Sequence, residues 1–173
     1  MKYILHAAIL ATVVIITALG NASNGQAQND DALVTYKSLK PAVALELAQA
    51  AFTECQNAGY QVAITVTDRF GHVLVVLRDQ FAGPHTVDTA TRKAWTAVSF
   101  RTATLELNDL IRENKVMAKL GDITNALALG GGLPVRAAGV LVGGIGISGA
   151  PGAELDHDCA AKAIESLQDM LDF

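Results

Sequence analysis

The chain has 173 residues, 51% of them hydrophobic, and its formal net charge at pH 7 is −4. This charge argues against a nucleic-acid partner, because nucleic-acid affinity comes mainly from Lys and Arg side chains that neutralise phosphates. The length allows one hydrophobic core and is too short for two ordinary domains, so a single folded domain is expected.

The first 27 residues are predicted to be a secretory signal peptide. A basic start is followed by an unbroken apolar run at residues 7–19, which is the pattern of a cleaved leader. The run is shorter than the roughly 20 apolar residues of a membrane span. The small residues Gly25 and Ala27 favour cleavage before Gln28, with the segment 20–22 as the second choice. The alternative is an N-terminal anchor that is retained.

Residues 28–37 are then expected to form a flexible segment, and residues 38–173 the folded domain. A cleaved leader implies a periplasmic or secreted protein with no stable membrane insertion. In such an oxidising compartment Cys55 and Cys159 could form a disulfide, provided that the first and last helices pack side by side. Otherwise the two cysteines would be small buried apolar residues.

The first helix is expected to begin at Pro41, because proline is favoured at the first helical position, and to end before Gly59. Two strands follow at residues 61–68 and 73–78, where β-branched residues recur. The short Gly-containing turn between them indicates an antiparallel hairpin. Residues 82–84 then break the chain.

The second half of the chain is expected to alternate helices and short strands. A helix begins at Thr86, and a further helical stretch at 101–119 is expected to break near 102–104. Three more strands are predicted at residues 126–129, 133–135 and 140–148, with a closing helix at 154–171. The order is therefore α-β-β-α-α-β-β-β-α. Short turns between neighbouring strands indicate an antiparallel sheet.

Gly144, Gly146 and Gly149 spell the pattern G-x-G-x-x-G, which in dinucleotide-binding folds joins a strand directly to a helix. Here Pro151 and Gly152 separate the last glycine from the expected helix, and the strand belongs to an antiparallel set. The residues that follow are too few for a second βαβ half. The glycines are therefore predicted to serve backbone geometry and not nucleotide binding.

Four short motifs occur together in the folded region. They are V-x-D-x-x-G-H from Val66 to His72, K-A-x-T-A from Lys93 to Ala97, G-G-x-P from Gly131 to Pro134, and GGIGISGA followed by a helix start at Asp156. In this combination they resemble the GlcG/HbpS-like haem-binding family. That family includes extracytoplasmic haem sensors and the C-terminal domain of PduO-type corrinoid adenosyltransferases. The resemblance covers the chain from about Ser38 to the C-terminus.

The resemblance implies an α+β fold: a three-layer α/β/α sandwich around a five-stranded antiparallel sheet, of the profilin or roadblock-like kind. It also implies homo-oligomers, from dimers to octamers, and haem or iron as the ligand. Two departures bear on that ligand. His157 stands where relatives commonly have an acidic residue, and residues 40–57 contain no His, although some relatives ligate haem through a His in the first helix.

Three histidines beyond the leader are candidate iron ligands, because neutral imidazole is a common ligand of haem iron and of other metals. His72 follows the hairpin glycine, His85 lies in the loop before the second helix, and His157 lies in an Asp-His-Asp sequence. Asp156 and Asp158 are equally well explained as complements to the helix dipole. A closed zinc site is not expected, because no H-x-x-x-H or C-x-x-C spacing occurs.

Haem also requires an apolar slot and cations for its propionates. Arg92 and Lys93 could pair with carboxylates, and the resemblance adds Thr96 as a weak ligand or lining residue. The candidate walls are Trp95, Phe81 and Phe70. The alternative places Trp95 in the core and both cations on a solvated helix face.

Three functions remain open at this point. The first is an exported haem- or iron-binding sensor, scavenger or carrier. The second is an enzyme that degrades haem or acts on a small oxygenated metabolite, although no G-x-S-x-G elbow occurs and no catalytic residue is assigned. The third is an oligomeric structural or interaction module. Histidines that converge on one pocket would favour the first two, whereas scattered histidines would favour the third.

Overall fold

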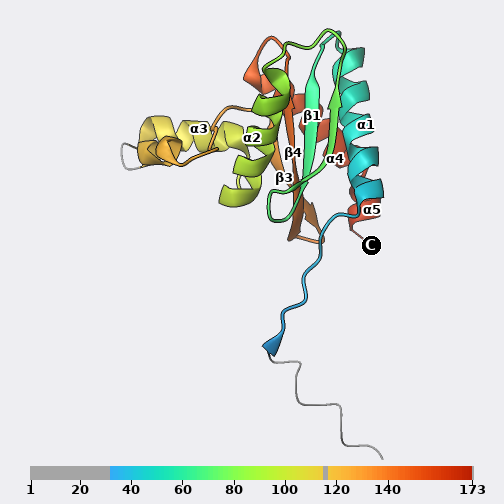
Figure 1. Cartoon of the computed structure of the whole chain (residues 1–173), viewed down its shortest axis with the longest axis vertical. Coiled ribbons are helices and arrows are strands. Elements are labelled where there is room, and N and C mark those ends of the chain that lie inside the picture. The colour runs from blue at the N-terminus through green and yellow to red at the C-terminus, as the bar shows by residue number, and fades with distance from the viewer. Residues whose placement is uncertain (1–31, 115–116, 173) are drawn as a thin grey trace, which may run out of the picture. The chain divides into compact units, whose positions relative to one another are not determined.

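Four antiparallel strands form the centre of the computed structural model (Figure 1). They are β1 (Ala63–Asp68), β2 (Val73–Arg78), β3 (Gly132–Ala137) and β4 (Val140–Ser148), in the order β2-β1-β4-β3. The long central pairing of β1 with β4 runs from Ala63 opposite Ser148 to Asp68 opposite Gly143. The sheet is therefore built from a hairpin at each end of the domain sequence, which meet through their inner strands.

The structure describes residues 32–114 and 117–172. The predicted signal peptide at 1–27 lies outside the described residues. Within them, no helix combines the length and apolar character needed to cross a membrane. Residues Lys37–Phe173 cluster as one unit.

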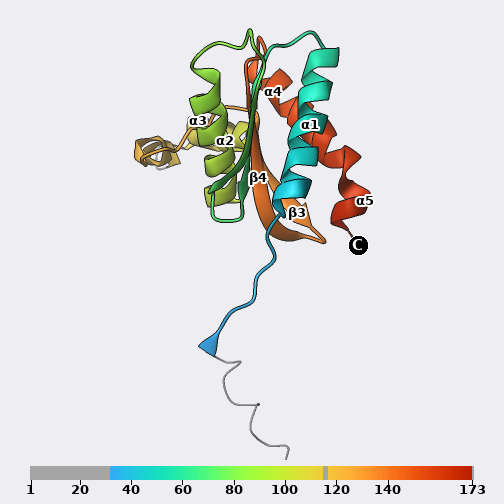
Figure 2. The same cartoon turned by 45° about the vertical axis from the view of Figure 1, so that its right-hand side comes forward.

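Helices cover both faces of the sheet (Figures 1 and 2). On one face lie α1 (Pro41–Asn57) and α4 (Ala153–Ser166), with the short α5 (Gln168–Leu171) after α4. On the other face lies α2 (Thr86–Phe100). The expected arrangement, with helices on both faces of an antiparallel sheet, is confirmed.

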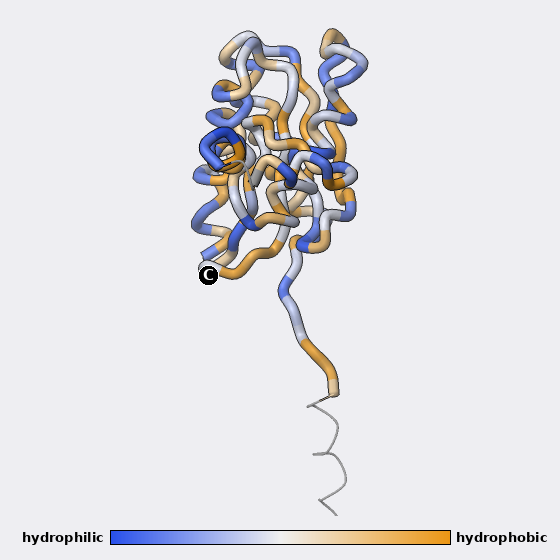
Figure 3. Tube along the Cα trace, turned by 90° about the vertical axis from the view of Figure 1, so that its left-hand side faces the viewer, coloured by the Kyte–Doolittle hydropathy of each residue, from blue (hydrophilic) through white to orange (hydrophobic). Residues whose placement is uncertain are grey.

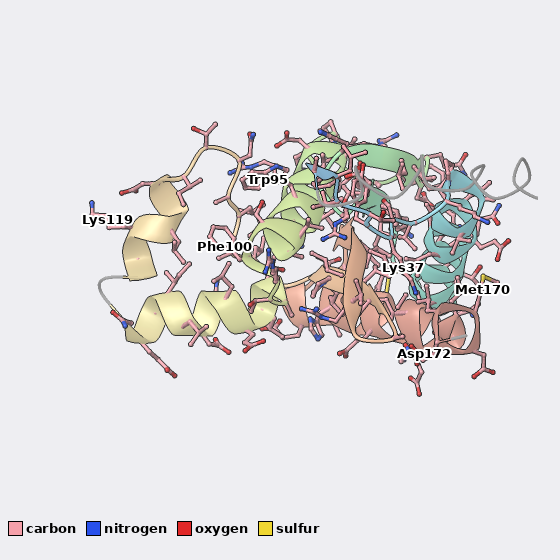
Figure 4. The ribbon with its side chains drawn as sticks, turned by 90° about the horizontal axis from the view of Figure 1, so that it is seen from below. Lys37, Trp95, Phe100, Lys119, Met170 and Asp172 are labelled. Carbon is pink, nitrogen blue, oxygen red and sulfur yellow. A yellow bond between two sulfur atoms is a disulfide. The ribbon has the colours of Figure 1, made fainter. Side chains whose placement is uncertain are left out.

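The helices α3 (Thr104–Glu113) and η2 (Met117–Asp122) form an arm that projects away from the sheet (Figure 4). Arg101 ends α2 in a left-handed conformation with φ of 56°, which confirms the expected break near 102–104. Phe100, the last residue of α2, is at the end of that helix beside this arm in Figure 4.

The expectation of five strands is wrong, because residues 126–129 form a connecting segment and not a strand. Side chains of α2 and α3 take up the backbone groups that a neighbouring strand would otherwise bind. The bonds run from Arg92 to the Ala126 carbonyl (3.1 Å), from the Leu127 amide to Thr96 (2.9 Å), from Asn108 to the Ala128 carbonyl (2.7 Å) and from Thr104 to the Leu129 carbonyl (2.6 Å). Each residue of the segment is thereby tethered to a helix.

The two faces of the sheet differ in side-chain size. Ile64, Ile145 and Ile147 are fully buried and belong to the core cluster that includes residues of α1 and α4. Hydrophobic and hydrophilic residues alternate along the trace of the folded part (Figure 3). On the α2 face Gly144 and Gly146 allow close packing. A Cβ at Gly146 would lie 2.6 Å from the Ala94 nitrogen and closer still to the Ala90 carbonyl. Gly144 and Gly146 of the G-x-G-x-x-G pattern therefore admit the backbone of α2, whereas Gly149 has a positive φ of 135° and lies against the backbone of Gln61.

Cys55 of α1 and Cys159 of α4 form a disulfide with a Cα–Cα distance of 5.5 Å. Both residues are buried. The disulfide was expected only if the first and last helices pack side by side, and they do. It joins two cysteines that are 104 residues apart in the sequence.

Candidate functional site

A cavity of about 360 Å³ lies where β4, α2 and α4 meet. It is lined by the loop before α2, by the inner side of α2, and by the turn from Ser148 to Ala153 that joins β4 to α4. We call it the His85 cavity, after the one imidazole among its lining residues. Its walls come from segments far apart in sequence, so only the fold brings them together.

The floor of the His85 cavity is a buried ion pair. The Lys93 ammonium donates to Oδ2 of Asp156 at 2.8 Å and to the carbonyl of Ile147 at 2.9 Å. The side chains of Lys93 and Asp156 are only 1% and 5% exposed. Oδ1 of Asp156 accepts a hydrogen bond from the amide of Ala150 at 3.0 Å. The pair thus ties α2 to the end of β4 and to the turn that precedes α4.

Burial dominates the titration of both members of this pair. Burial lowers the pKa of the Lys93 ammonium, and the attraction to Asp156 and the hydrogen bond between them offset part of that effect. Burial likewise raises the pKa of the Asp156 carboxyl, against the influence of Lys93 and of the backbone amides at Ala150 and Gly149. Each group is harder to ionise than it would be in water.

His85 is exposed and stands immediately before α2, at its N-cap position. Its ring lies against the backbone of Gly83, where a Cβ would approach the ring Cε1 at 2.8 Å. Among the described residues no hydrogen bond to either ring nitrogen is found. The loop beneath it is fixed, because Thr86 donates to the Gly83 carbonyl at 2.7 Å and Thr89 donates to the His85 carbonyl at 2.9 Å. An imidazole with free nitrogens is thus held at the rim of a cavity.

The three candidate histidines do not converge, which by the criterion set from the sequence favours the interaction module, so support for haem binding must come from other observations. His72 is exposed and follows Gly71, which packs against Trp95 so closely that a Cβ there would lie 2.8 Å from Cδ1 of the ring. Trp95 and His85 are ten residues apart along α2, or about 15 Å at 1.5 Å per residue. His157 is partly buried on α4, its Nδ1 is buried without a hydrogen-bond partner, and it does not line the His85 cavity. Within the described ranges no cluster of three or more His, Cys, Asp or Glu could hold a metal ion.

The other predicted site residues all make hydrogen bonds within the protein. Arg92 and Thr96 bind the segment 126–129, and Thr96 also donates to the Arg92 carbonyl at 2.7 Å. Lys93 is occupied by Asp156 and the Ile147 carbonyl. The Lys93–Asp156 pair was not predicted from the sequence. A signal was present, because Lys93 shares the helical stripe of the buried residues Ala90, Ala94 and Ala97.

A second hollow, of about 690 Å³, lies beside β3, between the start of α3 and the end of α4. Two arginines, Arg101 and Arg136, line it together with the carboxylates of Glu106, Glu165 and Asp172. No histidine is among its lining residues. Both hollows therefore carry charges of both signs, but only the His85 cavity has an imidazole in its lining.

Comparisons with known proteins agree with this architecture. The family model described as "Haem degrading protein HbpS-like" matches residues 39–165. A double mutant of HbpS from Streptomyces reticuli has a TM-score of 0.75 and 37% identity, and the match covers 86% of this chain and 99% of that one. A PduOC–haem complex has a TM-score of 0.68 and 31% identity, covering 75% and 94%.

A curated relative is the corrinoid adenosyltransferase PduO of Salmonella typhimurium, which is 33% identical over 124 residues. The matched part is 70% of this chain and 37% of that protein. The chain thus spans less than half the length of this relative.

Proposed function

The chain belongs to the HbpS-like family of haem-degrading proteins, and from that premise we propose that it binds haem. The PduOC relative of similar fold has been solved as a haem complex. The first helix of this chain contains no His, so a histidine ligand from that helix is excluded here. A histidine ligand to the iron must come from another element.

One observation supports His85 in that role. Of the three histidines within the described residues, His85 alone lines the cavity at the β4–α4 turn, with both ring nitrogens free of hydrogen bonds from described residues. Two exposed apolar side chains accompany His85. Leu129 lines the same cavity and is 40% exposed, and Phe81, four residues before His85 in the sequence, is 76% exposed. Exposed apolar side chains near an imidazole fit a flat apolar ligand that carries a metal.

The chain's own contribution would be to ligate and orient. His85 supplies a ring nitrogen, and the bonds from Thr86 and Thr89 fix the loop that carries it. Bound haem would supply redox chemistry and a position for small molecules at its iron. The Lys93–Asp156 pair would keep the cavity floor in place without charging it strongly, since the two charges offset each other.

We further propose that the protein works outside the cytoplasm, in the periplasm or secreted, as a haem sensor, scavenger or carrier. Two features support this. Residues 1–27 have the pattern of a leader, and the Cys55–Cys159 disulfide is of a kind that persists in oxidising compartments. Amino-terminal sequencing of protein recovered from the native host would test the cleavage before Gln28.

A hemin titration tests the proposal. Purified protein should shift the Soret band of hemin with saturable binding, and His85→Ala should weaken binding about ten-fold or more, which corresponds to about 1.4 kcal/mol or more. His72→Ala is the matched control, because His72 is also an exposed histidine. Equal loss in both variants would contradict the assignment to His85, and no Soret shift in either redox state would end the proposal. A parallel titration with ferric citrate separates haem from iron as the ligand.

Haem degradation is a second candidate, favoured by the description of the family. Hemin-loaded protein would then lose its Soret band when a reductant and oxygen are supplied, and would release iron with an identifiable tetrapyrrole product. Catalase in the assay removes bleaching by free hydrogen peroxide. A Soret band that persists under these conditions assigns the protein to binding alone.

We also propose that the protein assembles as a homo-oligomer. The edge strand β2 supports this, because Val73 and Val76 are 48% and 40% exposed on it and exposed sheet edges readily pair with another chain. Light scattering on the purified protein gives the mass directly. A monomer at micromolar concentration would contradict this part of the proposal.

A further inference from the structure

A buried hydroxyl in the His85 cavity lacks a protein partner. Ser148, the last residue of β4, is 5% exposed and lines the cavity. No hydrogen bond to its hydroxyl comes from any residue in the described ranges, and the oxygen is not among the fully enclosed atoms. Because this oxygen is still accessible and Ser148 lines the cavity, the hydroxyl is open to the cavity, where water or a ligand can accept its hydrogen bond.

Backbone donors lie at the start of α4, where Ala153 lines the cavity and Glu154 follows it in the helix. The helix α4 has 14 residues and begins at Ala153 after the N-cap Gly152. The amides of Ala153 and Glu154 have no acceptor among the described residues, whereas those of Leu155 and Asp156 are bound to the Gly152 carbonyl at 3.1 and 3.3 Å. Free amides at a helix start favour anionic oxygens. Ser148 and these amides are separate donors on the two sides of the β4–α4 turn.

The charges around this turn limit how strongly an anion is held. Lys93 and Asp156 offset each other at the floor. Glu154 is exposed, and its Oε2 would lie 3.3 Å from a Cβ at Gly152, so its carboxylate is beside the helix start. This negative charge opposes a ligand anion, although solvent screens an exposed charge. A carboxylate of a larger ligand, held also by other contacts, fits better than an isolated small anion.

We infer that Ser148 and the start of α4 form a carboxylate-binding subsite of the His85 cavity. The inference rests on the proposed haem binding, in which the carboxylate is a haem propionate. The Ser148 hydroxyl donates to the carboxylate, and the Ala153 and Glu154 amides complete its coordination. The cavity thereby selects porphyrins that keep a free acid group. None of the sequence motifs assigns Ser148 this role.

Titrations of hemin and of hemin dimethyl ester in the same detergent buffer separate recognition of the carboxylate from binding of the iron and the macrocycle. The ester keeps the iron and the macrocycle but cannot present a carboxylate. Wild-type protein should bind hemin about ten-fold more tightly than the ester, as expected for one hydrogen bond to a charged group. Ser148→Ala should remove most of this preference, and Ser99→Ala, on an exposed part of α2, should keep it.

Glu154→Gln gives an independent test in the opposite direction. Removing this charge should tighten hemin binding about two- to five-fold, the range expected for one charge near a helix end. Binding of the ester should not change. An equal gain for both porphyrins would overturn the inference, because it would place the carboxylate elsewhere.

The outcomes separate this inference from the proposed function. If hemin and its ester bind equally well through His85, the subsite is wrong and haem binding stands. If hemin does not bind at all, haem binding is wrong, and a titration with sodium propionate decides the subsite. Amide shifts at Ala153 and Glu154 that Ser148→Ala abolishes would then support it for free carboxylates. No such shifts would overturn it.

Discussion

At the scale of single residues, two charged side chains lie where the helical stripes predict apolar ones. Lys93 shares its stripe with Ala90, Ala94 and Ala97, and Asp156 shares the buried stripe of α4 with Cys159. The sequence could have indicated that each charge is buried. It could not indicate that they pair, because 63 residues separate them and only the packing of α2 against the β4–α4 turn joins them.

Breaking the pair on one side should destabilise the protein strongly. Lys93→Met leaves the Asp156 carboxylate buried without its partner, and we expect a loss of about 3–5 kcal/mol in the free energy of unfolding. The double variant Lys93→Met, Asp156→Leu should lose less than Lys93→Met alone, because no buried charge remains. Urea unfolding measures both. A double variant less stable than the single one would show that the pair is not the cause.

The pH dependence of stability has a definite sign at this pair. Burial raises the pKa of Asp156, so between the ordinary Asp pKa and the raised one the unfolded chain has released a proton that the folded chain keeps. The free energy of unfolding therefore falls as pH rises through that window. The lowered pKa of Lys93 acts at alkaline pH, where stability falls as pH decreases below the ordinary Lys value.

Urea unfolding of the wild type and of the double variant from about pH 4 to 7 isolates this effect, since the other carboxyls are common to both. The wild type should lose stability relative to the variant as pH rises. A relative gain would mean that the attraction of Lys93 outweighs the burial of Asp156.

At the scale of elements, regular patterns were predicted well and irregular connections were not. The β2 strand has the predicted bounds, and α1 begins at Pro41 as expected. The segment 126–129 has the apolar character of a strand, yet its backbone groups bond to side chains of α2 and α3. Local composition cannot reveal such tertiary bonds, and the fifth strand was predicted for that reason.

The glycines of β4 set how closely α2 can pack. Gly146→Ala should destabilise the protein by about 1–3 kcal/mol, the usual cost of overpacking, because its Cβ would meet the backbone of Ala90 and Ala94. Gly121→Ala is the control, since a Cβ there meets nothing within 4 Å. Thermal unfolding of the two variants compares them. If Gly146→Ala were as stable as Gly121→Ala, close packing would not explain the glycine.

At the scale of the whole molecule, the disulfide joins the two helices that cover one face of the sheet. It closes a loop of 104 residues between Cys55 and Cys159. The sequence alone could not decide whether this disulfide forms, because its formation depends on the side-by-side packing of α1 and α4. The same dependence holds for the site: His85, Ser148 and the start of α4 meet only in the folded chain.

Removal of the disulfide should lower stability substantially. The double variant Cys55→Ser, Cys159→Ser should lose about 2–5 kcal/mol, mainly because the unfolded chain regains the freedom of a long loop. Urea unfolding with and without reductant measures the loss, and reductant should not affect the variant. An unchanged midpoint for reduced wild-type protein would contradict a stabilising role.

The proposal that His85 ligates haem iron is tested most directly by locating the iron in a hemin complex. Crystals of the hemin complex, measured at the iron absorption edge, give an anomalous difference peak that marks the metal independently of the porphyrin density. We predict the peak within coordinating distance of a ring nitrogen of His85, at the cavity between β4, α2 and α4. A peak beside His72, beside His157 or in the hollow between Arg101 and Arg136 would contradict it.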